Sequence, residues 1–190
     1  MILDFLVYII PVVFVLGFLL LASRYIKNRS NTWGLFARNQ QLFFNTARGQ
    51  YEYPVVHGKV DGRSFLLGRF KRGSSYTLIE MGLNKELPEG TYFGADHFHS
   101  SIIKRLTLGE DIETGDPKFD KKVIVKGKDV HNIISYLDVG KRETIIELTE
   151  LGAEVCDNKI RIKSRRDIRQ LDKLEEIFSE LIRLALKLEE

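Results

Sequence analysis

The hydrophobic pattern divides the chain into an apolar opening run and a long stretch of mixed apolar and polar positions. Residues 5–22 contain no charged side chain. A helix of roughly 20 apolar residues crosses the hydrocarbon core of a bilayer. The pattern therefore predicts a transmembrane anchor over residues 1–23, a basic juxtamembrane segment over 24–30 and one soluble domain over 31–190.

A secretory signal peptide is the alternative interpretation of this run. Such a peptide has a basic start, a shorter apolar core and a cleavage site of small residues. Here Asp4 is the only charged side chain before the core, and Leu19 to Leu21 are not small. An uncleaved anchor is therefore favoured. The positive-inside rule then predicts a cell-membrane protein whose soluble domain is cytoplasmic, because the basic residues follow the anchor: Arg24, Lys27 and Arg29.

Periodicity predicts that the soluble part begins with an amphipathic helix and continues with strands. Residues 31–47 place their apolar side chains at helical spacing, and these are Trp33, Phe36, Ala37, Phe43, Phe44 and Ala47. This face packs either on the domain's own sheet or on the membrane surface. Asp61-Gly62 between two apolar runs predicts a β-hairpin. Further alternating runs extend an antiparallel meander over residues 53–99.

The second half predicts another hairpin and a long final helix. Asp157-Asn158 separates two short apolar strands, and two short helices precede them, split at Val139-Gly140. The last helix is expected from about Arg165 to Leu188, with a possible capping box formed by Ser164 and Asp167. The fold class is thus α+β: a mostly antiparallel sheet packed by helices, the longest at the C-terminus.

The wide apolar face of the last helix favours packing inside its own domain over a narrow coiled-coil seam. Contact with a protein partner or with a second copy of the chain through this helix is the alternative.

Composition sets limits on the partners. The chain has 29 Lys plus Arg and 26 Asp plus Glu, a formal net charge of +3. This balance, without a concentrated basic patch, is not typical of a nucleic-acid-binding protein. The single Cys156 cannot form an intrachain disulfide and is expected to be a small core residue.

Asp96, His97 and His99 form the best candidate for a metal site. In a strand, His97 and His99 share one face, so that two ring nitrogens can bind one ion. Further ligands are needed, and Asp116 or Asp120 are candidates for a metal-dependent hydrolase. Turn formation before a strand is the simpler role for both aspartates, and no cofactor is predicted.

Basic residues also alternate along one strand. Lys159, Arg161 and Lys163 project from one face because Ile160 and Ile162 separate them. With Arg24, Lys27 and Arg29, they are candidates to face anionic lipid headgroups or a partner protein. The alternative is a solvated face neutralised by nearby carboxylates.

Three short motifs, in order, suggest a family: Trp33, then Gly62-Arg63-Ser64-Phe65, then Thr114-Gly115-Asp116-Pro117-Lys118-Phe119-Asp120. Their arrangement behind an anchor resembles small bacterial single-pass membrane-anchored proteins classed as domains of unknown function. The resemblance implies this layout and no activity. The pattern as a whole favours a membrane-anchored cytoplasmic binding or scaffold domain over an enzyme. Such a domain would act by protein contact or by apposition to anionic headgroups, and a metal-dependent hydrolase is the alternative.

Overall fold

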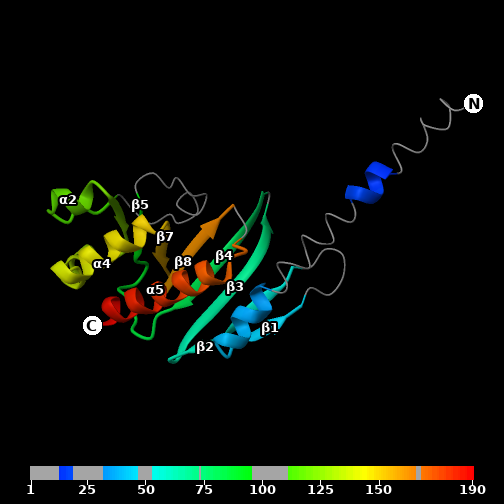
Figure 1. Cartoon of the computed structure of the whole chain (residues 1–190). Helices are drawn as coiled ribbons and strands as arrows, with labels where there is room; N and C mark the ends of the chain where they lie inside the picture. Colours follow the sequence, from blue (N-terminus) through cyan, green and yellow to red (C-terminus); the bar gives the residue numbers. More distant parts are fainter. Residues whose placement is uncertain (1–12, 19–31, 47–52, 73, 96–110, 166–167) are drawn as a thin grey trace, which may run out of the picture.

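The computed structural model describes residues 13–18, 32–46, 53–72, 74–95, 111–165 and 168–190. Over these residues the chain has the predicted α+β fold, with one antiparallel sheet of eight strands in the order β1-β2-β3-β4-β8-β7-β5-β6. Helices cover one face of this sheet (Figure 1). The strands are β1 (Phe43–Asn45), β2 (Val55–Val60), β3 (Arg63–Arg72), β4 (Ser74–Gly82), β5 (Tyr92–Ala95), β6 (Val123–Lys126), β7 (Ala153–Cys156) and β8 (Lys159–Ser164).

Both hairpin turns predicted from the sequence are confirmed. Asp61 and Gly62 have φ of 48° and 81°, and Asp157 and Asn158 have φ of 52° and 57°. A tight hairpin turn of this kind needs positive φ at both central residues, which Asp, Asn and Gly tolerate best. Strand β4 lies between the two hairpins, because it pairs with β3 on one side and with β8 on the other.

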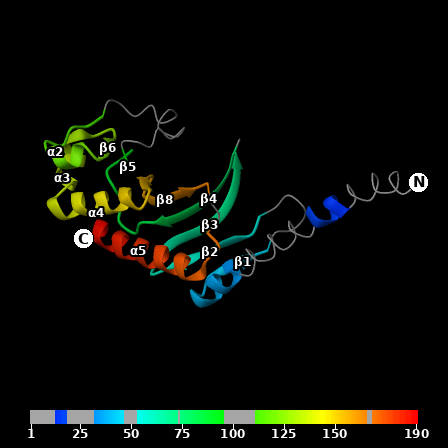
Figure 2. The same cartoon turned by 45° about the horizontal axis from the view of Figure 1, so that its top comes forward.

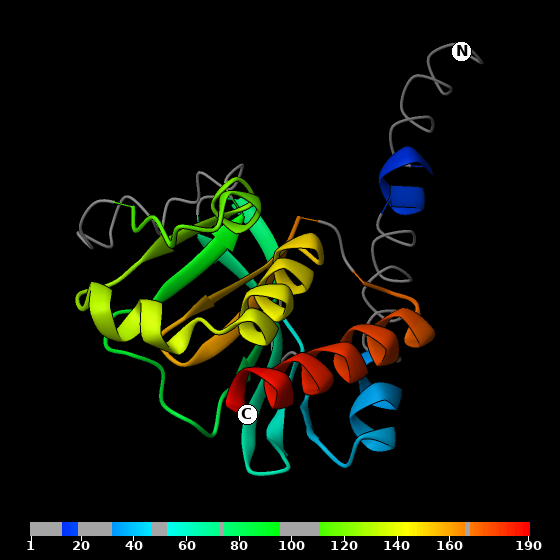
Figure 3. The same cartoon turned by 90° about the vertical axis from the view of Figure 1, so that its left-hand side faces the viewer.

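The helices form a layer over the apolar face of the sheet. They are α2 (Pro117–Asp120), α3 (Val130–Tyr136), α4 (Val139–Glu150) and α5 (Leu171–Glu189), and residues 32–39 are also helical. Helices α4 and α5 lie side by side in front of the strands (Figure 3). Helices α2 and α3 lie with β5 and β6 at one end of the domain, and helix 32–39 lies near β1 and β2 at the other (Figure 2).

Aromatic side chains join helix 32–39, the sheet and α5 into one core. The Phe178 ring on α5 meets Phe36 and Phe65 edge-on, with ring centroids 5.3 and 5.0 Å apart. Pairs of this geometry contribute roughly 0.5–1.5 kcal/mol beyond the burial of their area. Trp33 and Phe36 are fully buried in the same cluster. Helix 32–39 is therefore an integral part of the domain, and the predicted packing of its apolar residues on the sheet is confirmed for Trp33 and Phe36.

The same helix is shorter than predicted. It ends at residue 39, Gln41 has a positive φ of 54°, and the chain continues into β1. Phe43 pairs with His57 of β2 and is 68% exposed. Phe43 and Phe44 fit a helical period by coincidence, because strand pairing decides their conformation. Ala47 lies outside the described residues.

The boundaries of the later helices also differ from the prediction. Helix α5 begins at Leu171 rather than near Arg165, because Ser164 belongs to β8 and pairs with Thr77. Ser164 therefore does not begin the helix, and Asp167 lies outside the described residues. The break between α3 and α4 falls at Leu137 and Asp138, and the side chain of Asp138 caps α4 through the Lys141 N–H at 2.8 Å.

The apolar face of α5 is directed into the domain, as predicted. Its buried residues are Leu174, Phe178, Leu181, Leu184, Ala185 and Leu188. Among them, Leu174, Phe178, Leu181, Ala185 and Leu188 follow the alternating spacing of four and three residues that is typical of a coiled-coil seam. Contact with a second chain or a partner through this helix stays a prediction.

The last turn of α5 is held by side chains from three other segments. Glu189 accepts hydrogen bonds from the Arg63 guanidinium, at 3.1 Å from Nε, and from the backbone N–H of Asn84 at 2.6 Å. Lys85 donates to the Glu189 carbonyl at 3.1 Å, and the Tyr136 hydroxyl donates to the Leu188 carbonyl at 2.7 Å. Arg63 is only 5% exposed, and a buried guanidinium without a carboxylate partner would destabilise the fold. The domain therefore needs Glu189 as the partner of Arg63.

Most of the predicted anchor lies outside the described residues. Of the segment 1–23, only residues 13–18 are described, and they are helical. A search of the described part of the chain finds no helix with the length and hydropathy needed to span a membrane. The anchor therefore stays a prediction.

Candidate functional site

The basic row on β8 is neutralised within the sheet. Lys159 Nζ lies 2.7 Å and Arg161 Nε 2.9 Å from the two carboxylate oxygens of Glu80 on β4. Lys163 pairs in the same way with Glu154 on β7. The strand register produces these pairs, because Arg161 lies directly opposite both Glu80 and Glu154. Lys159, Arg161 and Lys163 therefore fit the alternative interpretation, in which nearby carboxylates neutralise a basic face.

Despite burial, the ion pairs with Lys159 and Arg161 lower the pKa of the Glu80 carboxyl group. Burial by itself would raise the pKa of this carboxyl group, but the hydrogen bonds from Lys159 and Arg161 outweigh burial, and the pKa lies below its usual value. Glu80 is therefore ionised at neutral pH and holds two cations on the sheet.

The candidate metal ligands Asp96, His97 and His99 lie outside the described residues, as do Arg24, Lys27 and Arg29. Within the part of the chain that is described, no three His, Cys, Asp or Glu side chains are grouped so that they could hold a metal ion. The proposed ligand set therefore stays a prediction.

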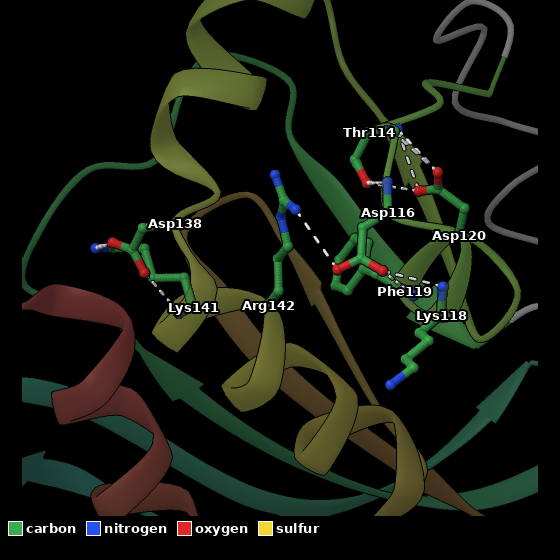
Figure 4. Close-up of polar contacts among 9 residues, drawn as sticks. Thr114, Asp116, Lys118, Phe119, Asp120, Asp138, Lys141 and Arg142 are labelled. Carbon is green, nitrogen blue, oxygen red and sulfur yellow. Dashed lines mark hydrogen bonds and ion pairs between the residues drawn. The ribbon is translucent and has the colours of Figure 1, made fainter.

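Asp116, one of the two possible additional ligands, has a structural role in the loop that leads to β6 (Figure 4). Its carboxylate caps α2 by accepting from the backbone N–H groups of Phe119 at 3.3 Å and Lys118 at 3.0 Å. These bonds, with the nearby Arg142 guanidinium at 3.5 Å, lower the pKa of Asp116 despite a small opposing effect of desolvation. The capped turn places Phe119 in the core, where its side chain is fully buried.

Asp120 closes the same loop from its other end. Its carboxylate accepts from the Thr114 hydroxyl at 2.7 Å, from the Thr114 N–H at 3.1 Å and from the Gly115 N–H at 3.2 Å (Figure 4). Both aspartates are thus hydrogen-bonded to the backbone of their own loop. This geometry fits a rigid turn rather than a pair of carboxylates that face a substrate.

Cys156 is buried in β7, as expected for a core residue. Burial, assisted by the neighbouring Asp157, raises the pKa of the thiol to about 11. At neutral pH the side chain is therefore a neutral thiol, which is a weak nucleophile.

An open groove of about 540 Å³ lies beside the start of α5, and it was not predicted from the sequence. It lies between β8, the end of α4 and the N-terminal end of α5. Its apolar lining includes Leu151, Ile162 and Ile177, and its basic lining is Lys163, Arg169 and Lys173. The alternation on β8 indicated Lys163, but no pattern along the chain indicates that α4 and α5 meet beside it.

The groove adjoins the point where helix 32–39 is attached to the rest of the domain. Trp33 Nε1 donates to the Ile168 carbonyl, and the Thr32 hydroxyl donates to the Arg169 carbonyl, both at 3.1 Å. Ile168 and Arg169 also line the groove. The first described residues after the predicted anchor are therefore fixed to the rim of the groove.

Comparison with protein-family models, with curated proteins and with solved structures finds no match to this chain. The resemblance to membrane-anchored domains of unknown function accordingly stays a prediction.

Proposed function

We propose that the protein is a single-pass membrane protein that holds an α+β binding domain against the cytoplasmic surface of the bilayer, where the domain contacts anionic lipid headgroups. The apolar run over residues 5–22 and the basic residues that follow it support the anchor and its orientation. Contact with a partner protein is the other interpretation that the sequence leaves open.

The attachment of helix 32–39 carries the proposal. Because Thr32 and Trp33 are hydrogen-bonded to Arg169 and Ile168, the chain is attached to the folded domain from residue 32 onward. Only residues 24–31 separate it from the predicted anchor. Eight residues span at most roughly 28 Å when fully extended. A domain on so short a connection stays beside the membrane surface. There it is within reach of lipid headgroups and of proteins at the membrane.

The binding role is supported by the state of the candidate catalytic groups that the structure describes. Asp116 and Asp120 maintain their loop, and the Cys156 thiol is buried with a raised pKa. None of these three groups has the geometry of a nucleophile or a general base. The groove beside α5, by contrast, is open and amphipathic.

Membrane extraction tests the anchor. We expect the full chain to remain in the membrane pellet after washing with alkaline carbonate, whereas a matched chain that lacks residues 1–23 is released. In inside-out vesicles an added protease is expected to digest the domain, and in right-side-out vesicles the domain is protected. Release of the full chain by carbonate would contradict the anchor, and the reverse protease pattern would contradict the cytoplasmic location.

A further inference from the structure

We infer that the groove between β8, α4 and α5 binds the headgroup of an anionic phospholipid of the membrane to which the chain is anchored. This inference rests on the proposed membrane anchor and adds a defined site and ligand class to it. Three observations support it: the charge of the lining, its apolar wall and its position next to helix 32–39.

The charge of the lining selects an anion. No Asp or Glu is among the described residues that line the groove, and although Lys163 lines it, its side chain projects from the face of β8 opposite to Ile162 and pairs there with Glu154. The basic charge at the groove comes from Arg169 and Lys173, which are exposed at its rim. Helix α5 starts between these two residues, and its N-cap residue Gln170 makes no side-chain hydrogen bond to the first turn. The partial positive charge of the helix end adds to the field of the basic side chains.

The apolar wall selects an amphiphile over a free inorganic anion. Ile162 and Ile177 form part of the wall beside the basic side chains, and Leu151 is 42% exposed at its edge. A phospholipid presents a phosphate next to its glycerol and the first acyl carbons. The basic rim and the apolar wall match these two parts. A volume of about 540 Å³ lies within the range of small-ligand sites.

The position of the groove selects a ligand in the membrane. Ile168 and Arg169 line the groove and also accept the hydrogen bonds of Trp33 and Thr32. The end of the domain that carries the groove is therefore the end to which the anchor is joined through residues 24–31. The distal end of α5 lies away from this point, so only its N-terminal end is held near the headgroups (Figure 3).

Two lysines on α5 provide a matched pair for the test. Lys173 lines the groove, and Lys187 is exposed near the other end of the same helix. At a rise of 1.5 Å per residue, they are roughly 21 Å apart along the helix axis. The full chain is placed in nanodiscs of phosphatidylcholine alone, or of phosphatidylcholine mixed with phosphatidylglycerol. An uncharged amine-acetylating reagent is added, and mass spectrometry follows each lysine.

We expect acetylation of Lys173 to be about fivefold slower in the phosphatidylglycerol discs, the factor that corresponds to the attraction of one basic side chain to an anionic leaflet. Lys187 should react at the same rate in both lipids. High salt should remove the protection of Lys173, because the attraction is screened. In the Arg169→Gln variant the protection should decrease, while the backbone carbonyl that accepts from Thr32 remains. Unchanged emission of Trp33 would show that the variant is folded.

Equal rates at Lys173 in both lipids would overturn the inference, and so would a slowing that affects Lys187 to the same degree. Protection that survives in Arg169→Gln and in high salt would also overturn it. A chain that cannot be incorporated into the discs contradicts the anchor instead, so failure of the proposed function is distinguishable from failure of this site.

Discussion

Removal of the Glu189 carboxylate should destabilise the domain, because this group holds the last turn of α5 to two other segments. The carboxylate is the acceptor for the Arg63 guanidinium, which is 5% exposed, and for the Asn84 N–H at 2.6 Å. In Glu189→Ala, Arg63 keeps its charge in a buried position without its partner. Removal of one member of a buried ion pair costs about 3–5 kcal/mol. Glu189 itself is 12% exposed and lies in the last helical turn. Fraying of that turn admits water to Arg63, so we expect a loss of about 2–3 kcal/mol.

A double-mutant cycle separates the ion pair from the helix end. Arg63→Met should cost less, about 1 kcal/mol, because Glu189 can turn toward water when its cation is absent. The double variant should be at least as stable as Glu189→Ala, since it contains no buried charge without a partner. The measurement is urea unfolding of the full chain in detergent micelles. It is followed by the emission of Trp33, the only tryptophan of the chain and fully buried in the core.

Two results would refute this reasoning. One is a Glu189→Ala variant with the unfolding free energy of the parent chain. The other is a double variant whose loss equals the sum of the two single losses, because additivity means that the two side chains do not interact. Glu190→Ala, one residue further along, is the matched control and should change stability by less than about 0.5 kcal/mol, as exposed substitutions usually do.

Two further predictions concern ionisable groups inside the sheet. Because the folded pKa of Glu80 lies below its usual 4.5, its ionised form stabilises the fold above that pH, and the stabilisation is lost as the pH falls through the lower folded value. Glu80→Gln should therefore reduce the acid dependence of the urea midpoint below pH 4.5, and an unchanged pH profile would contradict this. With its pKa raised to about 11 from the usual 9.0, the Cys156 thiol should react with iodoacetamide at least about a hundredfold more slowly in the folded chain than in urea, and equal rates would show that β7 opens readily.

The sequence allowed the local turns of this fold to be predicted, because they depend on adjacent residues. Asp61-Gly62 and Asp157-Asn158 each determine a hairpin through their own backbone preferences. The helix over residues 31–47 was predicted too long, because its end depends on a contact with another strand and not on adjacent residues. Its second half forms β1 only because β2 pairs with it, and that contact cannot be recognised from periodicity.

The candidate site was harder to predict, since its chemistry depends on contacts between distant segments. The alternation of Lys159, Arg161 and Lys163 was recognised, but the carboxylates that neutralise them are on β4 and β7. Of this row, only Lys163 lines the groove, because β8 ends beside α5. Whether a basic residue on a strand is neutralised therefore depends on the carboxylates of the neighbouring strands, and the register determines which of them lie within reach.

The strand order has a consequence for synthesis of the chain. Strand β8 lies between β4 and β7 in the sheet although it is the last strand in the sequence. The meander β1–β4 emerges from the ribosome first, with Phe65, Leu67 and Met81 on the face that α5 later covers. The part of that face that helix 32–39 does not cover stays open to solvent until nearly the whole domain has been translated. A nascent chain at this stage presents an apolar sheet face to its surroundings, where chaperones are expected to be among its first contacts.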